Sequence, residues 1–268
     1  MRISNSEIQT FKRCKRKWWF NYYLRLKPAL EVYTGPSSIG NRVHSALEQY
    51  YNMLYYGETT ENAIGDSLGT HDSDVSHVIA ERGWQDGDPD LKKFESEAEL
   101  TRLMLEGYFE WLQETGADEG LEVVSVERPV TWAIDDDIEI MGKLDVRVYR
   151  QHDGATLGID HKTTQSLEVP VRTLHMNEQE LMYEWLLHKV TYGARVDGSL
   201  WNFLRKCKRT ASAKRRKARG QRCGTAGAPA RHAAGAQIEA ARARGEAQSR
   251  GNRHVAACPK GRVAGACK

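Results

Sequence analysis

The chain has 268 residues, of which 40% are hydrophobic and 28% are charged, so most of it can bury a core as one large domain or two modest ones. No stretch approaches the roughly 18 apolar residues of a membrane span and no secretory leader opens the chain, which argues against membrane and secreted proteins. The net charge of +3 conceals two compositions, because residues 1–205 carry 22 Lys and Arg against 34 Asp and Glu, whereas residues 206–268 carry 17 against 2.

The first helix is predicted over residues 4–13, where Ser4 or Ser6 can cap a run of apolar residues at helical spacing. Residues 14–20 then mix Lys and Arg with Trp and Phe. That mixture can hold a nucleic-acid strand by charge and stacking. A helix whose rings are buried in the core while its cations face solvent is the commoner arrangement, and we expect that one.

Two further helices are predicted in the N-terminal half. Residues 39–55 carry apolar side chains at i, i+3, i+4, i+7 and i+8. Residues 57–90 are polar and rich in Asp and Gly, so they predict at most a short helix and no site. Residues 96–115 have the pattern of an amphipathic helix, which the capping-box pair Ser96 and Glu99 would start.

The middle of the chain predicts a sheet. Residues 123–134, 138–149 and 155–163 are rich in β-forming residues and are separated by turn-forming Asp and Gly residues, which predicts an antiparallel three-stranded meander. Residues 178–192 return to a helical pattern, and residues 198–205 predict a further strand. This order of elements predicts one α+β or α/β domain ahead of the basic tail.

Residues 206–268 form a tail that differs in composition from the domain over residues 1–205. Ala, Arg and Gly make up more than half of the tail and it has no aromatic residue, so we expect mostly disorder, with a short helix around residues 233–243 from alanine propensity. Two interpretations stay open. The tail can be a basic arm whose residues 214–217 grip phosphates, or the product of a shifted reading frame in a GC-rich gene that was never selected to fold.

The chain has five cysteines, of which Cys14 lies in the domain and the others lie in the tail or at its edge. An odd number of thiols in a chain without a leader argues for a reducing compartment rather than a disulfide framework. We therefore expect a cytoplasmic protein.

Two predicted strands carry charged residues that can converge. Asp145 lies in the second strand, and Asp160 and Lys162 end the third strand. Because side chains alternate along a strand, Asp160 and Lys162 lie on one face, about 7 Å apart along it, and Asp145 reaches the same face if the two strands pair. Two carboxylates and an ammonium are costly on a dry face unless a cation compensates them.

A divalent cation can supply that compensation. Mg²⁺ prefers oxygen ligands and is usually held by one or two carboxylates together with a substrate phosphate. Such an ion can polarise a scissile phosphate and lower the pKa of a bound water, and Lys162 would orient that water or stabilise charge on phosphorus. For the Asp-x-Lys motif alone, a surface ion pair between Asp160 and Lys162 is the alternative.

Two more features complete the pattern. His44 precedes Glu48 by one helical turn, and Gln179 and Tyr183 are four residues apart on the predicted helix after the third strand, so they share one face. Taken alone, such a histidine is usually a hydrogen-bonded structural residue, and the second pair could bridge neighbouring loops.

In this order the motifs resemble the RecB-like branch of the PD-(D/E)xK nuclease superfamily, which includes CRISPR-associated exonucleases. Residues 11–18 are similar to the F-x-x-C-P-R-K-W motif of that branch, except that Lys15 replaces the proline. Residues 142–145 and 160–162 match its Gly-x-x-Asp and Asp-x-Lys strands. The resemblance spans about residues 3–190.

The resemblance implies a restriction-endonuclease-like α/β core and a Mg²⁺- or Mn²⁺-dependent deoxyribonuclease. The implied metal ligands are His44, Asp145, Asp160 and the backbone carbonyl of His161. The implied catalytic residues are Lys162, Asp160 and Asp145. Gln179 and Tyr183 would position the DNA strand.

Some members of this branch also hold an iron–sulfur cluster with four cysteines. Cys14 matches the first ligand, and Cys258 and Cys267 have the outer spacing of the C-terminal triplet, but Gly261 occupies its middle position. The sequence therefore favours a chain without the cluster, in which Cys14 is a buried thiol or an orphaned ligand.

The leading hypothesis is an exonuclease that acts on the ends of linear single- or double-stranded DNA in recombination, repair or phage replication, with a recombination or repair protein as a candidate partner. The alternative within the family is a CRISPR adaptation nuclease. A catalytically inactive DNA-binding subunit is a third hypothesis, against which the retained Asp145, Asp160 and Lys162 argue. A small-molecule hydrolase has no substrate-pocket motif behind it.

Overall fold

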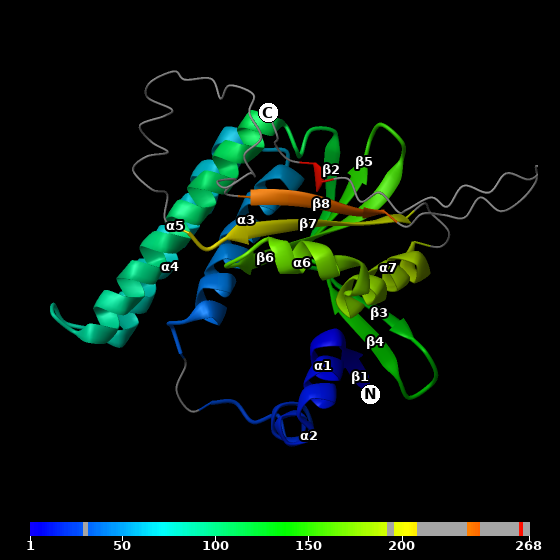
Figure 1. Cartoon of the computed structure of the whole chain (residues 1–268), viewed down its shortest axis with the longest axis horizontal. Helices are drawn as coiled ribbons and strands as arrows, with labels where there is room; N and C mark the ends of the chain where they lie inside the picture. The colour runs from blue at the N-terminus through cyan, green and yellow to red at the C-terminus, as the bar shows by residue number, and fades with distance from the viewer. Residues whose placement is uncertain (29–31, 192–195, 208–234, 242–262, 265–268) are drawn as a thin grey trace, which may run out of the picture.

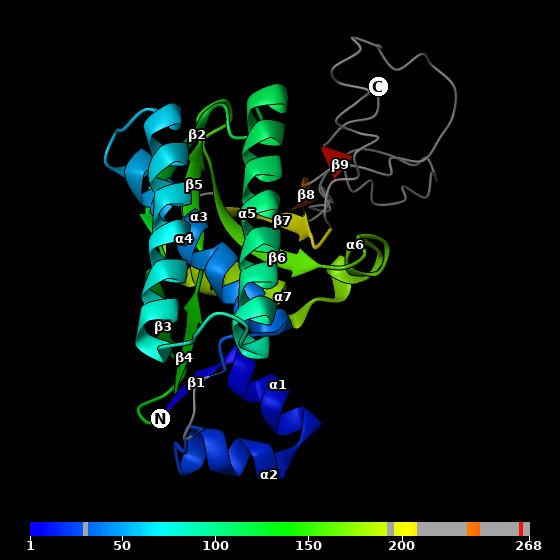
Figure 2. The ribbon, with the colours of Figure 1, turned by 90° about the vertical axis from the view of Figure 1, so that its left-hand side faces the viewer.

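The computed structural model of the protein describes residues 1–28, 32–191, 196–207, 235–241 and 263–264. It has a mixed α+β fold, as the sequence predicts, in which helices cover two β-sheets (Figures 1 and 2). The helices are α1 (Asn5–Arg13), α2 (Lys15–Trp18), the π-helical turn η1 (Trp19–Tyr23), α3 (Pro36–Tyr55), α4 (Thr60–Arg82), α5 (Pro89–Thr115), α6 (Glu168–Thr173), the short 3-10 turn η2 (Leu174–Met176) and α7 (Glu178–Val190). The strands are β1 (Arg2–Ser4), β2 (Leu121–Val126), β3 (Pro129–Ala133), β4 (Glu139–Lys143), β5 (Val146–Arg150), β6 (Ala155–Thr164), β7 (Val196–Arg205), β8 (Gly235–Ala241) and β9 (Val263–Ala264).

Local sequence explains where two of the helices begin. The side chain of Ser4 accepts a hydrogen bond from the backbone N–H of Glu7 and caps α1, as predicted. α5 begins at Pro89 after the N-cap Asp88, so the start predicted at Ser96 is wrong. An Asp-Pro pair favours a helix start because the aspartate caps the first turn and proline has no N–H to leave unsatisfied.

α4 is much longer than the short helix predicted for this polar segment. The Ser67 hydroxyl is buried and donates to the backbone carbonyl of Ala46 in α3 at 2.6 Å, and Ala63 packs into the core beside it. Packing against α3 therefore stabilises a helix whose own propensity is low. No helix in the described part of the chain is both long and apolar enough to cross a membrane.

The predicted meander is present, but each of its first two strands is divided. Glu127, with a φ of 50°, separates β2 from β3, and residues 144–145 separate β4 from β5. β2, β5 and β6 pair antiparallel in the larger sheet, of order β2-β5-β6-β7-β8-β9, whereas β3 and β4 join β1 in a smaller sheet, of order β1-β4-β3. The pairing of β5 with β6 ends at Val146 and Ile159, and β6 continues beyond that point as the two sheets separate.

The other edge of the larger sheet is built on β7. β7 lies parallel to β6, which requires the crossover through α6 and α7. β8 lies antiparallel to β7, so the helix predicted around residues 233–243 is wrong. The open edge of β7 offers a row of backbone hydrogen bonds, and these outweigh the helix propensity of alanine. Apart from residues 206–207, 235–241 and 263–264, the tail, including residues 214–217, lies outside the described residues.

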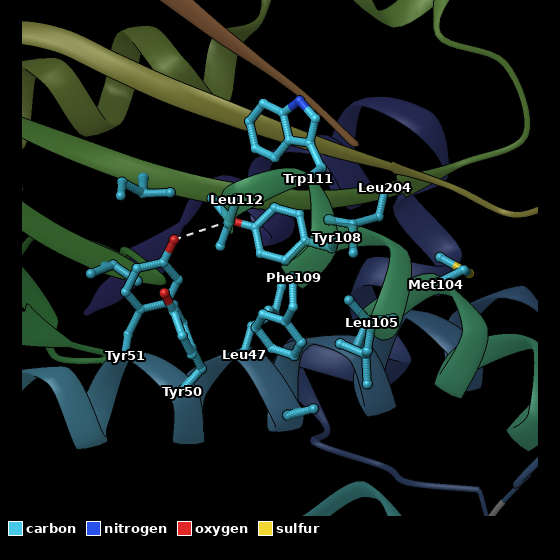
Figure 3. Close-up of a cluster of buried hydrophobic side chains, with 14 of the residues drawn as sticks. Leu47, Tyr50, Tyr51, Met104, Leu105, Tyr108, Phe109, Trp111, Leu112 and Leu204 are labelled. Atoms are coloured by element: carbon cyan, nitrogen blue, oxygen red, sulfur yellow. Dashed lines mark hydrogen bonds between the residues drawn. The ribbon is translucent and has the colours of Figure 1, made fainter. Parts of the chain in front are cut away.

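A buried core lies between the larger sheet and helices α3 and α5 (Figure 3). It contains polar groups as well as apolar ones. The Tyr51 hydroxyl lies 3.1 Å from the Tyr108 hydroxyl and donates to Asp118 Oδ2 at 2.9 Å. Asn202 Nδ2 donates to the Tyr108 hydroxyl at 2.9 Å and lies 3.3 Å from His161 Nδ1. This chain of polar groups connects α3 and α5 to β6 and β7.

Changing Tyr108 to phenylalanine is expected to lower the free energy of unfolding by about 1–3 kcal/mol, because it leaves the buried amide of Asn202 without its hydroxyl acceptor. Urea denaturation of parent and variant measures the difference. Tyr56→Phe is the matched control, since Tyr56 is 78% exposed and its change should have little effect. Equal stability of Tyr108→Phe and the parent would contradict a contribution from these hydroxyls.

The N-terminal helices α1 and α2 lie together at one end of the molecule (Figures 1 and 2). β1 joins this segment to β4, and α1 contacts α7. The rings of this segment that are most exposed, at 39–60%, are those of Phe11, Trp19, Phe20 and Tyr23. The prediction that the rings are buried in the core is therefore wrong, because the segment docks through β1 and α1 and leaves one face of α2 and η1 open.

Candidate active site

The candidate site lies where β5 and β6 separate. Asp145 stands between β4 and β5, and its Oδ2 accepts a hydrogen bond from the backbone N–H of His161 at 2.7 Å. The carboxylate thus bonds to β6 beyond the last strand pair, Val146 with Ile159. Since the N–H and C=O of a residue in an extended strand point to the same side, the carbonyl of His161 faces this gap as well.

Asp160 and Lys162 lie on one face of β6, as their spacing predicts. Lys162 Nζ is 2.5 Å from Asp160 Oδ2, and Asp160 Oδ1 accepts a hydrogen bond from Gln179 Nε2 at 3.0 Å. Asp160 is 3% exposed, whereas the Lys162 side chain is 36% exposed. The carboxylate is therefore held from two sides, while the ammonium remains accessible to a ligand.

Two more side chains approach Asp145 from different elements. His44 of α3 places Nδ1 3.3 Å from Asp145 Oδ2. Glu127, between β2 and β3, completes a group of three, because one ligand atom each of His44, Glu127 and Asp145 lies within 4.8 Å of the others. Glu127 also forms an ion pair with Lys143.

The sequence alone does not single out Glu127, which looks like an ordinary position of a long strand. Its φ of 50° is uncommon for a residue other than glycine, and its N–H donates to the Asp145 carbonyl at 2.8 Å. This turn ties the β2–β3 junction to the site. The sequence signal for it is Pro129, because proline is not tolerated in the middle of a paired strand and so indicates a break.

The donor set suits a hard divalent cation. The carboxylates of Asp145 and Glu127, the imidazole of His44 and the backbone carbonyl of His161 are mainly oxygen donors, which Mg²⁺ and Mn²⁺ prefer. Of the predicted ligands, His44 and Asp145 lie together, and the carbonyl of His161 faces the same gap. Asp160 belongs to the same charge cluster, since the negative charge of Asp145 helps to raise its pKa.

The two aspartates have pKa values that are pushed in opposite directions. Burial raises the pKa of Asp160 to about 6, because it outweighs the attraction of Lys162 and the charge of Asp145 adds to it. Burial acts on Asp145 in the same sense, but the hydrogen bond and charge of His44, with a smaller contribution from the charge of Lys162, lower its pKa to about 2. Asp145 is therefore a fixed negative charge, while Asp160 can take up a proton.

The two histidines have different parts in the site. Burial lowers the pKa of His44, but the hydrogen bond and charge of Asp145 outweigh it, so the pKa is raised overall. Burial lowers the pKa of His161 to about 3, which keeps its ring neutral. That ring stacks on Tyr51, with 5.4 Å between centroids, and lies edge-on to the ring of His44, with 6.3 Å between centroids, so the buried His161 side chain lies between the core and the site.

Gln179 and Tyr183 share one face of α7, as predicted, and they pack against the strands. Gln179 holds Asp160, as described above. Tyr183 lies against Gly142, where an added Cβ would come within 2.9 Å of the Tyr183 ring and 2.7 Å of Leu186. Burial, with a smaller effect from the charge of Asp160, raises the pKa of Tyr183 to about 12. Gly142 therefore allows α7 to approach β4 closely.

Cys14 is exposed, so the prediction of a buried thiol is wrong. Its Sγ accepts a hydrogen bond from the backbone N–H of Lys17 at 3.4 Å and caps α2. Cys223, Cys258 and Cys267, which bear on an iron–sulfur cluster, lie outside the described residues, as does Gly261.

Binding of Mg²⁺ or Mn²⁺ is expected to weaken as the pH falls from 8 to 5. The slope approaches about tenfold per pH unit for each bound proton once the pH is below the pKa of the group that carries it. The protons are those of Asp160, whose pKa is about 6, and of His44 and Glu127, whose pKa values are also raised. Isothermal titration calorimetry at several pH values measures the slope. Asp160→Asn and His44→Gln should each weaken binding and flatten the slope, and a pH-independent affinity in the parent protein would contradict the assignment.

Comparison with known proteins adds one match. A family model described as the PD-(D/E)XK nuclease superfamily matches residues 2–268, a range that includes every candidate residue named above. The α+β architecture agrees with the restriction-endonuclease-like core of that superfamily. No curated protein matches the chain. The family model specifies the superfamily and no branch within it.

Proposed function

Because the chain belongs to the PD-(D/E)XK nuclease superfamily, whose members use divalent metals, we propose that it is a Mg²⁺- or Mn²⁺-dependent exonuclease that hydrolyses phosphodiester bonds at the ends of linear DNA. The observation that carries the proposal is the convergence of Asp145, Asp160 and Lys162 at the gap between β5 and β6. The order of the motifs from His44 to Tyr183 supports a place in the RecB-like branch.

His44, Asp145, Asp160 and the carbonyl of His161 would hold the ion, with Glu127 close enough to complete its shell. A bound divalent ion polarises the scissile phosphate and generates a nucleophile from water at neutral pH. Asp145 provides a permanent negative charge for this purpose, since its pKa is about 2.

Lys162 would act directly on the reacting phosphate. Its Nζ is held 2.5 Å from Asp160 and its side chain is partly exposed, so the ammonium can donate to a phosphate oxygen or to the attacking water. Donors fixed before the reaction stabilise the charge that develops in the transition state at little reorganisation cost. Gln179 is a positioning residue in this proposal, because its hydrogen bond fixes the carboxylate that orients Lys162.

The proposal places the protein in recombination, repair or phage DNA metabolism, with a recombination or repair protein as a candidate partner. A cytoplasmic location is part of the proposal. It is supported by the free, exposed thiols of Cys14 and Cys207, which suit a reducing compartment.

A digestion assay tests the proposal with end-labelled linear and closed circular DNA, single- and double-stranded, in Mg²⁺, Mn²⁺ or EDTA. We expect metal-dependent loss of the linear forms and persistence of the circular ones. Cleavage of circular DNA would assign an endonuclease instead. Binding without cleavage under every condition would favour the inactive DNA-binding subunit.

A further inference from the structure

The positive charge of the folded part is concentrated near its N-terminus. Residues 8–28 contain no Asp or Glu and seven cations, namely Lys12, Arg13, Lys15, Arg16, Lys17, Arg25 and Lys27. Residues 29–205 carry 14 Lys and Arg against 33 Asp and Glu. A polyanion that approaches the acidic body of the molecule would therefore be attracted to this end of it.

Large aromatic rings lie exposed among these cations. Phe11 is 43% exposed, Trp19 44%, Phe20 39% and Tyr23 60%. The rings of Trp19 and Tyr23 are stacked, with 4.0 Å between centroids and 17° between planes. Lys15 Nζ lies 5.5 Å from the ring centroid of Phe11. We call these four rings and seven cations the N-terminal platform.

A hollow beside the platform offers room for a flat ligand group. It has a volume of about 520 Å³ and is lined by ten residues, among them Trp18, Tyr23, Arg25 and Met141. Its lining combines aromatic rings with the guanidinium groups of Arg2 and Arg25 and the carboxylate of Glu7. Unpaired nucleic-acid bases stack on aromatic rings and on guanidinium groups.

The N-terminal platform is joined to the candidate active site through the first turn of α7. Lys12 Nζ lies 2.7 Å from Glu178 Oε2, and Gln9 Nε2 donates to the same oxygen at 2.5 Å. The next residue, Gln179, holds the carboxylate of Asp160. A strand on the platform would therefore lie next to the helix that orients the proposed catalytic group.

We propose that the N-terminal platform binds single-stranded DNA, and that it presents an unpaired end of the substrate to the site. The partner is a single strand because its bases are free to stack on exposed rings, whereas the bases of a duplex stack on one another. The cations contact its phosphates. The presentation of the strand rests on the proposed nuclease function, while the binding of the strand does not.

Binding is tested in EDTA, so that cleavage cannot interfere, by fluorescence anisotropy with labelled oligothymidylate and with a duplex of the same length. The double variant Trp19→Ala/Tyr23→Ala of the full chain should weaken binding of the single strand by about tenfold or more and affect the duplex little. Trp185→Ala is the matched control, because Trp185 is 38% exposed but lies on α7, where the cation beside its ring is Lys189, 5.7 Å from the ring centroid. Thermal melting of each variant checks that it is folded.

The cations are tested separately through the salt dependence. Arg13→Gln/Lys17→Gln should reduce the slope of log affinity against log salt concentration by about 0.7 for each phosphate that the variant no longer neutralises. Lys92→Gln/Lys93→Gln is the matched control, since this exposed pair lies on α5. An unchanged slope in the first variant, or an equal change in the control, would overturn the assignment of the phosphate-binding cations.

The outcomes separate this inference from the proposed function. If Trp19→Ala/Tyr23→Ala binds the single strand like the parent, the inference is overturned whatever the cleavage assay gives. If the variant instead abolishes a dimer seen by sedimentation, the rings serve self-association and the inference is likewise overturned. If single-strand binding depends on the rings but Mg²⁺ gives no cleavage, the nuclease proposal fails and the binding surface stands.

Discussion

The Lys162→Ala variant is expected to lower the rate of metal-dependent DNA hydrolysis by about a hundredfold to a thousandfold, with little loss of DNA binding. The ammonium of Lys162 lies 2.5 Å from the buried carboxylate of Asp160, and the Lys162 side chain remains 36% exposed to solvent. Alanine removes the donor that would stabilise charge on the phosphate, and it leaves the carboxylate to Gln179 alone. Single-turnover cleavage of end-labelled DNA at saturating Mg²⁺ measures the effect on the chemical step.

Lys189→Ala is the control for this variant. Lys189 Nζ lies 5.7 Å from the ring centroid of Trp185, and Lys162 Nζ lies at a similar distance, 5.4 Å, from that of Trp201. Lys189 differs in that it lies on α7 and contacts Trp185 rather than Asp160. Its loss should leave the cleavage rate close to that of the parent. A Lys162→Ala variant that cleaves as fast as Lys189→Ala would show that the Asp-x-Lys pair is scaffold and that the catalytic assignment is wrong.

The Asp145→Asn variant is expected to weaken Mn²⁺ binding by about a hundredfold and to reduce cleavage at fixed metal by at least as much. Asparagine keeps the size of the side chain and an oxygen that can accept the N–H of His161. It removes the negative charge that helps to raise the pKa of His44 and that would attract the metal ion. The effect on binding therefore reflects electrostatics more than packing. Calorimetric titration with Mn²⁺ measures the affinity directly.

Asp153→Asn is the matched substitution for Asp145→Asn. Asp153 also has a pKa lowered to about 2, in its case first by the hydrogen bonds of Arg150, but it lies at the turn between β5 and β6, at the opposite end of β5. Metal affinity should be unchanged in this variant. If both substitutions weaken metal binding equally, the loss is due to a general effect on the sheet, and Asp145 is not a ligand.

Local features of the sequence were sufficient to predict that the side chains of Asp160 and Lys162 lie on the same face of their strand. Alternation along a strand places residues two apart on one face whatever the rest of the chain does, so this relation could be predicted before any partner strand was known. The pairing of Gln179 with Tyr183 on one face of α7 has the same local origin, in the period of the helix. The cap at Ser4 is equally local, because its oxygen bonds an N–H three residues on.

Features that depend on which strands pair could not be predicted from local sequence. The breaks at Glu127 and at residues 144–145 arise because β3 and β4 join β1 in a second sheet while β2 and β5 stay with β6. The chain around both breaks has ordinary β-forming composition, and the partner β1 is more than a hundred residues away in sequence. The position of Glu127 beside His44 and Asp145 follows from these breaks and was missed for the same reason.

By itself, the sequence determined the elements with a strong local period, the α+β class and the spacing of the charged residues within each element. The tertiary structure alone decided which side chains from different elements meet and which rings stay uncovered. Asp145 reaches His161 because the pairing of β5 with β6 stops at Ile159 while β6 continues, and the aromatic face of α2 and η1 stays open because α1 docks on α7 through its polar side. The physical reason is that periodicity fixes directions within an element, whereas contacts between elements depend on register and docking energies spread over distant residues.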